Sequence, residues 1–245
     1  MNLDTTMLNF IKQVLRTAHL FKCEDFVIEK GYVRGWNTER TVVIADTNVP
    51  QLPFEGIGFN RVATLLNRLA LLEQYDITLE SKNGFVMGLV IKSSAATLRY
   101  KCANPSAIRT PKNIHDLPIW QIEFSPADIE LLQRARGVMG AAVAKLESVD
   151  GAFTVSFEDA DRDTYVQNVI GHIENIGGVN DSLSFVQHYD VVTLLTAMKN
   201  ADSANIKKGP DGSIIMTMGK SGNLVMRVNG IVINVCPMAI SKRIM

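Results

Sequence analysis

The sequence predicts an α+β fold in which one module of helices and antiparallel strands occurs twice. The first observation is a repeated helical pattern, VATLLNRL at 62–69 and VVTLLTAM at 191–198, a step of 129 residues. The second is a turn signal at matching positions, Asn83-Gly84 and Asp211-Gly212, a step of 128 residues. The third is a shared order of elements in the two halves. Matches that recur at one step indicate an internal duplication.

The first half is expected to contain a helix, two strands, a second helix and two more strands, at 5–19, 25–37, 40–46, 59–72 and on either side of Asn83-Gly84. The helices follow from apolar residues spaced along one face, and the strands from runs of β-branched and aromatic residues. Asp4 or Thr5 can cap the first helix. The apolar stripe of the second helix runs as far as Leu72.

The second half is expected to repeat this order with a strand, a helix, hairpin-like strands, a second helix and terminal strands, at 118–124, 126–137, 143–159 with 163–176, 184–200 and 212–238. Ser125 is expected to cap the N-terminus of the first of these helices, with Pro126 at the first helical position, and Gly137 is expected to end that helix. Asp150-Gly151 predicts a tight turn within the hairpin.

The two halves are expected to be separate domains, residues 1–104 and 119–245. The segment 105–118 between them contains three prolines and few apolar residues, which is typical of an extended linker.

Composition excludes several classes of protein. The chain has 25 basic and 25 acidic residues, so a nucleic-acid partner must be recognised by local charge. No basic segment leads into an apolar stretch at the start, so secretion is not expected, and no apolar run reaches the roughly 20 residues of a membrane span. Cys23, Cys102 and Cys236 are widely spaced, which favours isolated thiols in a reducing compartment over a disulfide or a metal site.

Local charge is concentrated on the four expected helices. Three acids stand on them, Asp128, Glu130 and Asp190, against seven basic residues, Lys12, Arg16, Arg61, Arg68, Arg134, Arg136 and Lys199. Two interpretations remain open at this point: a solvated polar face of accidental sign, or a surface that contacts nucleic-acid phosphates without sequence preference. No aromatic residues alternate with these cations, so duplex is the better partner than a single strand.

Several segments resemble those of sliding clamps, the processivity factors of DNA polymerases. They are ELLQRARG, AVAKLESVDGAFTVSF, SFVQHYDVVTLLTAMKN and VNGIVINVCPM. The chain is similar to the two-domain type, which includes proliferating-cell nuclear antigen and the clamps of myovirus-type phages. The resemblance implies two duplicated clamp domains, each with two pore-lining helices backed by antiparallel β-sheets.

The resemblance also implies a function. A protein of this kind encircles double-stranded DNA as a homotrimeric ring, three chains supplying six modules, and short edge strands pair head to tail across each junction. It tethers the replicative DNA polymerase, and it uses no cofactor and no metal. It is not an enzyme. The implied location is the cytoplasm of an infected bacterial host for a phage protein, and otherwise the nucleus or cytoplasm.

Residues carry over position by position. Lys12, Arg136 and Lys199 match basic positions that line the pore in sliding clamps. At two further positions, where these clamps usually have a basic pair, this chain has Thr64 and Asn67, and Arg61 and Arg68 lie one step beside them. Polymerase and clamp loader would bind through short peptide motifs, in a groove beside the linker and the last strand. The matching positions are Ile108, Ile114, Leu117, Val235, Pro237 and Met238.

Other chemistry is poorly supported by the sequence. GKSG at 219–222 lacks the earlier glycine of a phosphate loop and precedes a strand. His172 with Glu174, and His188 with Asp190, are better interpreted as surface residues than as acid–base pairs. The alternative function is a polymerase accessory or structural binding protein with the same duplicated fold that forms no ring.

Overall fold

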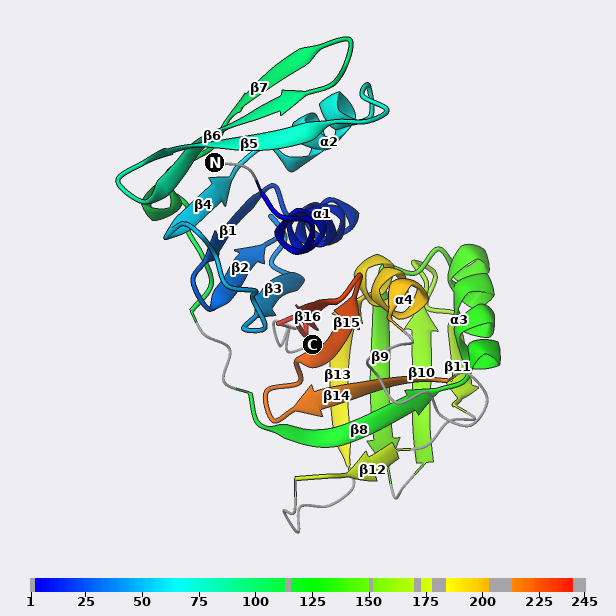
Figure 1. The fold of residues 1–245 in the computed structure, drawn as a ribbon. Helices are drawn as coiled ribbons and strands as arrows, with labels where there is room; N and C mark the ends of the chain where they lie inside the picture. The colour runs from blue at the N-terminus through cyan, green and yellow to red at the C-terminus, as the bar shows by residue number, and fades with distance from the viewer. Residues whose placement is uncertain are drawn as a thin grey trace. The chain divides into compact units, whose positions relative to one another are not determined.

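Each half of the chain forms a compact unit in the computed structural model, unit 1 over Met1–Ile114 and unit 2 over His115–Met245 (Figure 1). The structure describes residues 3–112, 116–149, 152–169, 173–177, 184–202 and 213–239. Ile114, His172 and both the Asp150-Gly151 and Asp211-Gly212 turns lie outside the described residues.

Unit 1 combines two helices with seven strands among its described residues. In chain order the elements are α1 (Thr5–Leu20), β1 (Asp25–Glu29), β2 (Tyr32–Trp36), β3 (Val42–Asp46), β4 (Gly56–Phe59), α2 (Val62–Leu69), β5 (Asp76–Lys82), β6 (Phe85–Lys92), β7 (Thr97–Lys101) and the short 3-10 helix η1 (Pro105–Ala107). The strand order is β3-β2-β1-β4-β6-β5, and β7 also pairs with β6. Only the β4–β6 pair is parallel among these strands.

Unit 2 contains two helices and two sheets within its described residues. The elements are β8 (Pro118–Phe124), α3 (Pro126–Met139), β9 (Val143–Val149), β10 (Ala152–Glu158), β11 (Thr164–Asn168), β12 (Ile173–Asn175), β13 (Phe185–Asp190), α4 (Val191–Asn200), β14 (Ile214–Gly219), β15 (Leu224–Val228) and β16 (Ile231–Val235). One sheet has the order β12-β8-β14-β15-β16 and the other β11-β10-β9-β13.

The two units repeat one arrangement, which confirms the predicted duplicated α+β fold. In unit 1, β2 pairs with one edge of β1 and β4 with the other. In unit 2, β10 and β13 flank β9 in the same way. The repeated helices begin at the two valines of the repeated sequence pattern, Val62 for α2 and Val191 for α4.

Local sequence explains where the helices begin. The Asp4 carboxylate accepts a hydrogen bond from the Met7 amide at 2.7 Å, and the Asp190 carboxylate accepts one from the Thr193 amide at the same distance. Each side chain satisfies a backbone donor that has no partner within its helix. Ser125 forms a reciprocal capping box with Asp128 at the start of α3.

Three sequence-based expectations about the elements are wrong. Residues 185–190 form strand β13 rather than the first turns of the last helix, because Asp190 caps α4 and β13 pairs with β9. Helix α3 continues past Gly137 to Met139 and ends at Gly140, whose φ of 62° suits glycine. Helix α2 ends at Leu69, before Leu72.

Two strands were not expected at all, and the linker is not uniformly extended. Strand β4 is the glycine-rich GIGF, and β7 follows a short turn after β6. Gly58 in β4 has no room for a side chain, because a Cβ would lie 2.7 Å from the Ala103 carbonyl oxygen. The segment after β7 therefore packs closely on β4 before η1 begins.

Each unit has its own aromatic core. In unit 1 the rings of Phe26 and Phe59 stack at 4.8 Å, and in unit 2 Phe124 and Phe153 meet edge to face at 5.6 Å. Cys23 and Cys102 are buried free thiols, and Cys236 is a half-buried one. Within the described ranges, no helix has the length and apolar character needed to span a membrane.

Candidate nucleic-acid interface

Helix α1 carries a basic stripe opposite its packed face. The packed face is formed by seven buried residues, Met7, Phe10, Ile11, Val14, Leu15, Thr17 and Ala18. At about 100° per residue, Lys12 and Arg16 each lie about 160° around the helix from the buried Val14, so both are on the face opposite the packed one. They are also one helical turn apart, so both cations project from one place on the surface.

An aromatic residue accompanies this stripe, contrary to the sequence-based expectation. The Lys12 ammonium lies 5.0 Å from the centre of the Tyr75 ring. Tyr75 belongs to the loop between α2 and β5, so its position beside α1 depends on tertiary packing. The ring orients the Lys12 side chain through a cation–π contact and leaves its charge uncompensated.

Helix α2 contributes less charge than its sequence suggested. The Arg61 guanidinium donates a hydrogen bond from Nη2 to the Lys101 carbonyl oxygen at 3.1 Å and lies 5.3 Å from the Tyr100 ring. The Arg61 side chain therefore stabilises the packing of β7 within unit 1, and it is not directed to DNA by these contacts. Arg68 is exposed, about 60° from the buried Leu65 and so on the flank of the helix. The side opposite Leu65 bears the neutral Asn67.

In unit 2, a surface groove between α3 and α4 brings two predicted residues together. Arg136 in the last turn of α3 and Lys199 in the last turn of α4 both line it. Its other lining residues are Gln133, Val192, Leu195, Thr196 and Asn200. Cations at the C-terminal ends of two helices are also favoured by the helix dipoles. The groove offers two positive charges and several amide and hydroxyl groups to a phosphate.

Arg134 lies elsewhere on α3. It is about 200° from the buried Leu132, opposite the packed face, whereas Arg136 lies beside the groove. The exposed Glu130 precedes Arg134 by one helical turn, a spacing that brings opposite charges near each other. We expect Arg134 to add less net positive charge than Arg136.

The other helical acids are occupied at helix starts. Asp128 is fully buried; its carboxylate accepts hydrogen bonds from the Ser125 amide at 2.9 Å, the Ser125 hydroxyl at 2.7 Å and the Gln167 side-chain amide at 3.2 Å. Asp190 is the N-cap of α4, and its carboxylate accepts from the Thr193 amide. Two of the three acids are thus drawn toward helix N-termini, which leaves the exposed helical surfaces predominantly basic.

The residues expected to bind partner peptides differ widely in exposure. Leu117 is 78 % exposed and Met238 41 %, and Pro237 is partly exposed. Val235 is fully buried in β16, so it presents no surface to a partner in this structure. Ile108 is half-buried in unit 1, where a Cβ on Gly58 would lie 2.8 Å from its side chain.

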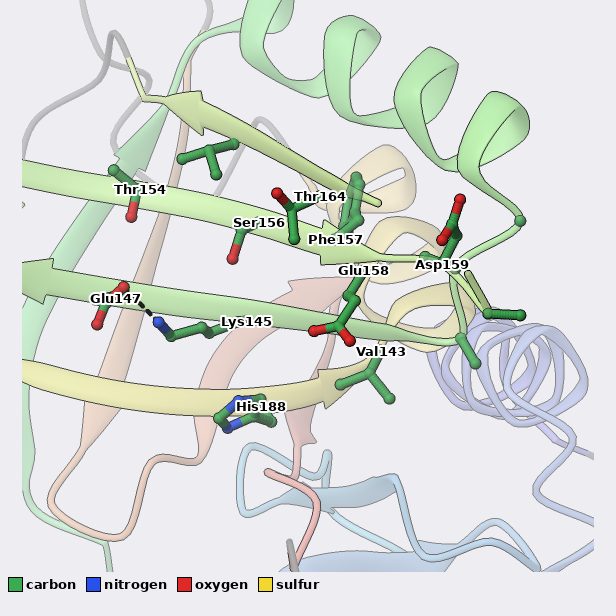
Figure 2. A pocket seen from close by; sticks show the side chains of 15 residues that line it. Val143, Lys145, Glu147, Thr154, Ser156, Phe157, Glu158, Asp159, Thr164 and His188 are labelled. Carbon is green, nitrogen blue, oxygen red and sulfur yellow. Dashed lines mark hydrogen bonds and ion pairs between the residues drawn. The ribbon is translucent and has the colours of Figure 1, made fainter. Parts of the chain in front are cut away.

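A hollow lies on the exposed face of the β11-β10-β9-β13 sheet, and Figure 2 shows its lining. Lys145 and Glu147 form an ion pair of 2.6 Å beside His188. Partial burial and the Lys145 ammonium lower the pKa of His188, and Glu147 opposes the shift. The Asp190 carboxylate is engaged as the cap of α4, in keeping with the expectation that it does not form an acid–base pair with His188. Among the described residues, no group of His, Cys, Asp or Glu side chains is arranged to hold a metal.

Two units that each back a helix pair with largely antiparallel sheets define the fold of a sliding clamp. The sequence matches no protein-family model and no curated protein, so the likeness is structural. One solved structure with this fold is PCNA of A. fulgidus with the C-terminal region of FEN-1 bound: TM-score 0.62, 15% identity, 96% of this chain and 97% of that chain covered. A PCNA2–PCNA3 complex of Sulfolobus tokodaii gives a TM-score of 0.58 at 13% identity and coverages of 94% and 96%.

The DNA polymerase sliding clamp of Bacillus subtilis is a third similar structure, with a TM-score of 0.62 and 14% identity. The match covers 95% of this chain but 62% of that one. This chain therefore has the length of the PCNA chains rather than of the longer bacterial clamp. At these identities the comparisons establish the sliding-clamp fold.

Proposed function

We propose that this protein is a DNA sliding clamp: a homotrimeric ring that encircles duplex DNA and tethers the replicative DNA polymerase without itself being an enzyme. The observation that supports this most is the placement of charge on the duplicated helix pairs. Lys12, Arg16, Arg136 and Lys199 are presented on helices, while Asp128 and Asp190 are engaged at helix starts. Such a surface can contact phosphates but does not distinguish one base sequence from another.

The helices offer DNA weak and mobile contacts. Duplex carries one charge per ~1.7 Å of axis. At physiological ionic strength screening acts beyond ~8 Å, so a cation contributes only when a phosphate is close. Four such cations per chain, none of them in a deep pocket, attract the duplex without fixing its position. That combination permits sliding.

Ring closure would use the free edges of two strands. Among the described residues, β7 pairs only with β6 and β11 only with β10. Strand β7 carries the exposed Arg99 and Lys101, whereas Asp161 and Asp163 precede β11 in an acidic turn. Antiparallel pairing of β7 with β11 of a second copy would set Lys101 beside Asp163. Edge strands with complementary charge support a head-to-tail junction.

Partners would dock as short peptides with apolar anchors. Leu117, Pro237 and Met238 are the predicted contact residues that unit 2 exposes. The A. fulgidus PCNA binds the C-terminal region of FEN-1, which supports recognition of a polymerase or loader segment in the same manner. A peptide that is flexible before binding gains affinity from a few buried anchors.

The proposal can be tested without a clamp loader, because a ring can pass onto a linear duplex over its free ends. Rings are allowed to pass over the ends of a linear duplex that carries biotin at both termini, and streptavidin then blocks the ends. We expect protein to remain on the DNA through a high-salt wash and to leave when the duplex is cut internally. Protein that washes off in salt, or that stays after cutting, is bound to the surface of DNA and supports the accessory protein that forms no ring.

A further inference from the structure

The first residues of unit 2 are fastened to the turn between β14 and β15. The Asp116 carboxylate accepts hydrogen bonds from the Ser221 amide at 2.9 Å, from the Ser221 hydroxyl, and from the Asn223 side-chain amide at 3.2 Å. The Asn223 backbone amide lies 3.4 Å from the same carboxylate. In the next residue, the Leu117 carbonyl oxygen accepts from the Lys220 amide at 3.2 Å. We name this set of contacts the Asp116 clasp.

The turn is shaped to receive the carboxylate. Gly219 leaves the necessary space, because a Cβ at that position would lie 2.2 Å from the Asp116 carboxylate. A second contact fixes the turn from within the unit: the buried Tyr189 hydroxyl donates to the Gly222 carbonyl oxygen at 2.7 Å. The sequence GKSG, which does not fit a phosphate loop, thus binds an anion supplied by the chain itself.

The clasp ends beside an exposed apolar side chain. Leu117 is 78 % exposed although its own carbonyl is hydrogen-bonded and Asp116 next to it makes several contacts. The hydrogen bonds hold the backbone that carries this large apolar side chain before a partner arrives. Binding then avoids most of the conformational entropy that ordering a free segment would cost.

We propose that Asp116 is a positioning residue for partner docking: through the clasp it holds Leu117 ready for an apolar anchor of a partner peptide. The inference rests on the proposed function, in which Leu117 contacts such peptides. It assigns to the 219–223 turn a role in recognition although the turn need not touch the partner. It also predicts that Asp116 acts only through Leu117.

Amide hydrogen exchange tests the clasp independently of any partner. In the wild-type protein the Lys220 and Ser221 amides should exchange slowly because both donate within the clasp. Asp116→Asn places an amide donor against these donors and should speed the exchange of both amides by roughly tenfold or more. Asp76→Asn, which changes an exposed acid at the start of β5, is the matched control and should leave both rates unchanged. Equal rates in wild type and Asp116→Asn would overturn the clasp.

Calorimetry with a synthetic peptide of the C-terminal tail of the cognate DNA polymerase tests the docking role. Asp116→Asn should weaken binding about tenfold, the order expected when one or two residues must be ordered on binding. Leu117→Ala should weaken it as well, and the double variant should bind no worse than Leu117→Ala alone. Additive losses, or unchanged affinity in Asp116→Asn, would overturn the positioning role. A wild-type chain that binds no peptide would instead refute the docking part of the proposed function.

Discussion

Removing the four helical cations should remove most of the salt dependence of DNA binding. The perturbation replaces Lys12, Arg16, Arg136 and Lys199 by alanine. Lys12 and Arg16 project from the exposed side of α1, and Arg136 and Lys199 line the groove between α3 and α4. None of the four residues has a described ion pair. Their loss should therefore leave each unit folded.

The magnitude follows from the number of phosphates these residues can reach. Each chain offers two contact places with two cations each, so one chain engaged with the duplex contacts about two to four phosphates. Binding to B-DNA then falls with salt at a logarithmic slope of about −1.8 to −3.6. Between about 50 and 200 mM salt the wild-type affinity should drop roughly 10- to 150-fold. The fourfold variant should lose most of that dependence.

Fluorescence anisotropy with a short labelled duplex measures this slope for wild type and variant. The matched control replaces four exposed basic residues outside the helices, Lys82, Lys92, Arg109 and Lys112, and removes the same net charge. We expect the control to keep the wild-type slope. If the helical variant keeps that slope, or if the control loses it equally, the helices are not the DNA-binding surface.

Three further predictions concern stability, assembly and thiol chemistry. Asp128→Ala should lower the free energy of unfolding in urea by about 2–4 kcal/mol, because it removes one half of the capping box of α3 and the acceptor of the Ser125 and Gln167 side-chain donors. A loss below about 1 kcal/mol would contradict this account. Lys101→Glu should reduce the native mass in light scattering and Asp163→Lys in the same chain should restore it, whereas an unchanged mass in the single variant would exclude this strand edge. Burial raises the pKa of the Cys23 and Cys102 thiols to about 12 and that of the Cys236 thiol to about 11. A disulfide reagent at neutral pH should therefore react slowly with all three until the chain is unfolded. Rapid reaction of the folded protein would contradict the buried positions.

The fold was predictable because the evidence for it is repeated and local. Apolar spacing, helix caps and tight-turn dipeptides each occur in both halves, and the repeated pattern coincides with α2 and with most of α4, although both helices were expected to begin earlier. Strand β13 was missed because its residues run directly into α4 and share its apolar character. Only the Asp190 cap and the pairing with β9 separate the strand from the helix.

The candidate site was predictable in part, since it depends on tertiary contacts. Helical spacing places Lys12 and Arg16 together, but it does not reveal that Arg61 donates to the Lys101 carbonyl of a distant strand. Tyr75 and Asp116 likewise meet their partners only in the folded chain. The turn that receives Asp116 is separated from it by 105 residues, so the sequence alone does not show that the two meet.

The mass of the protein in solution tests the central claim most directly. Each chain has a mass of 27.0 kDa, so a ring of three chains has three times that mass, about 81 kDa. Size-exclusion chromatography with light scattering, over a range of protein concentrations, should give this value at the higher concentrations without larger species, since the head-to-tail junctions close. A mass that remains at 27.0 kDa throughout would contradict the ring. A series of masses that grows with concentration would show junctions that form without closing.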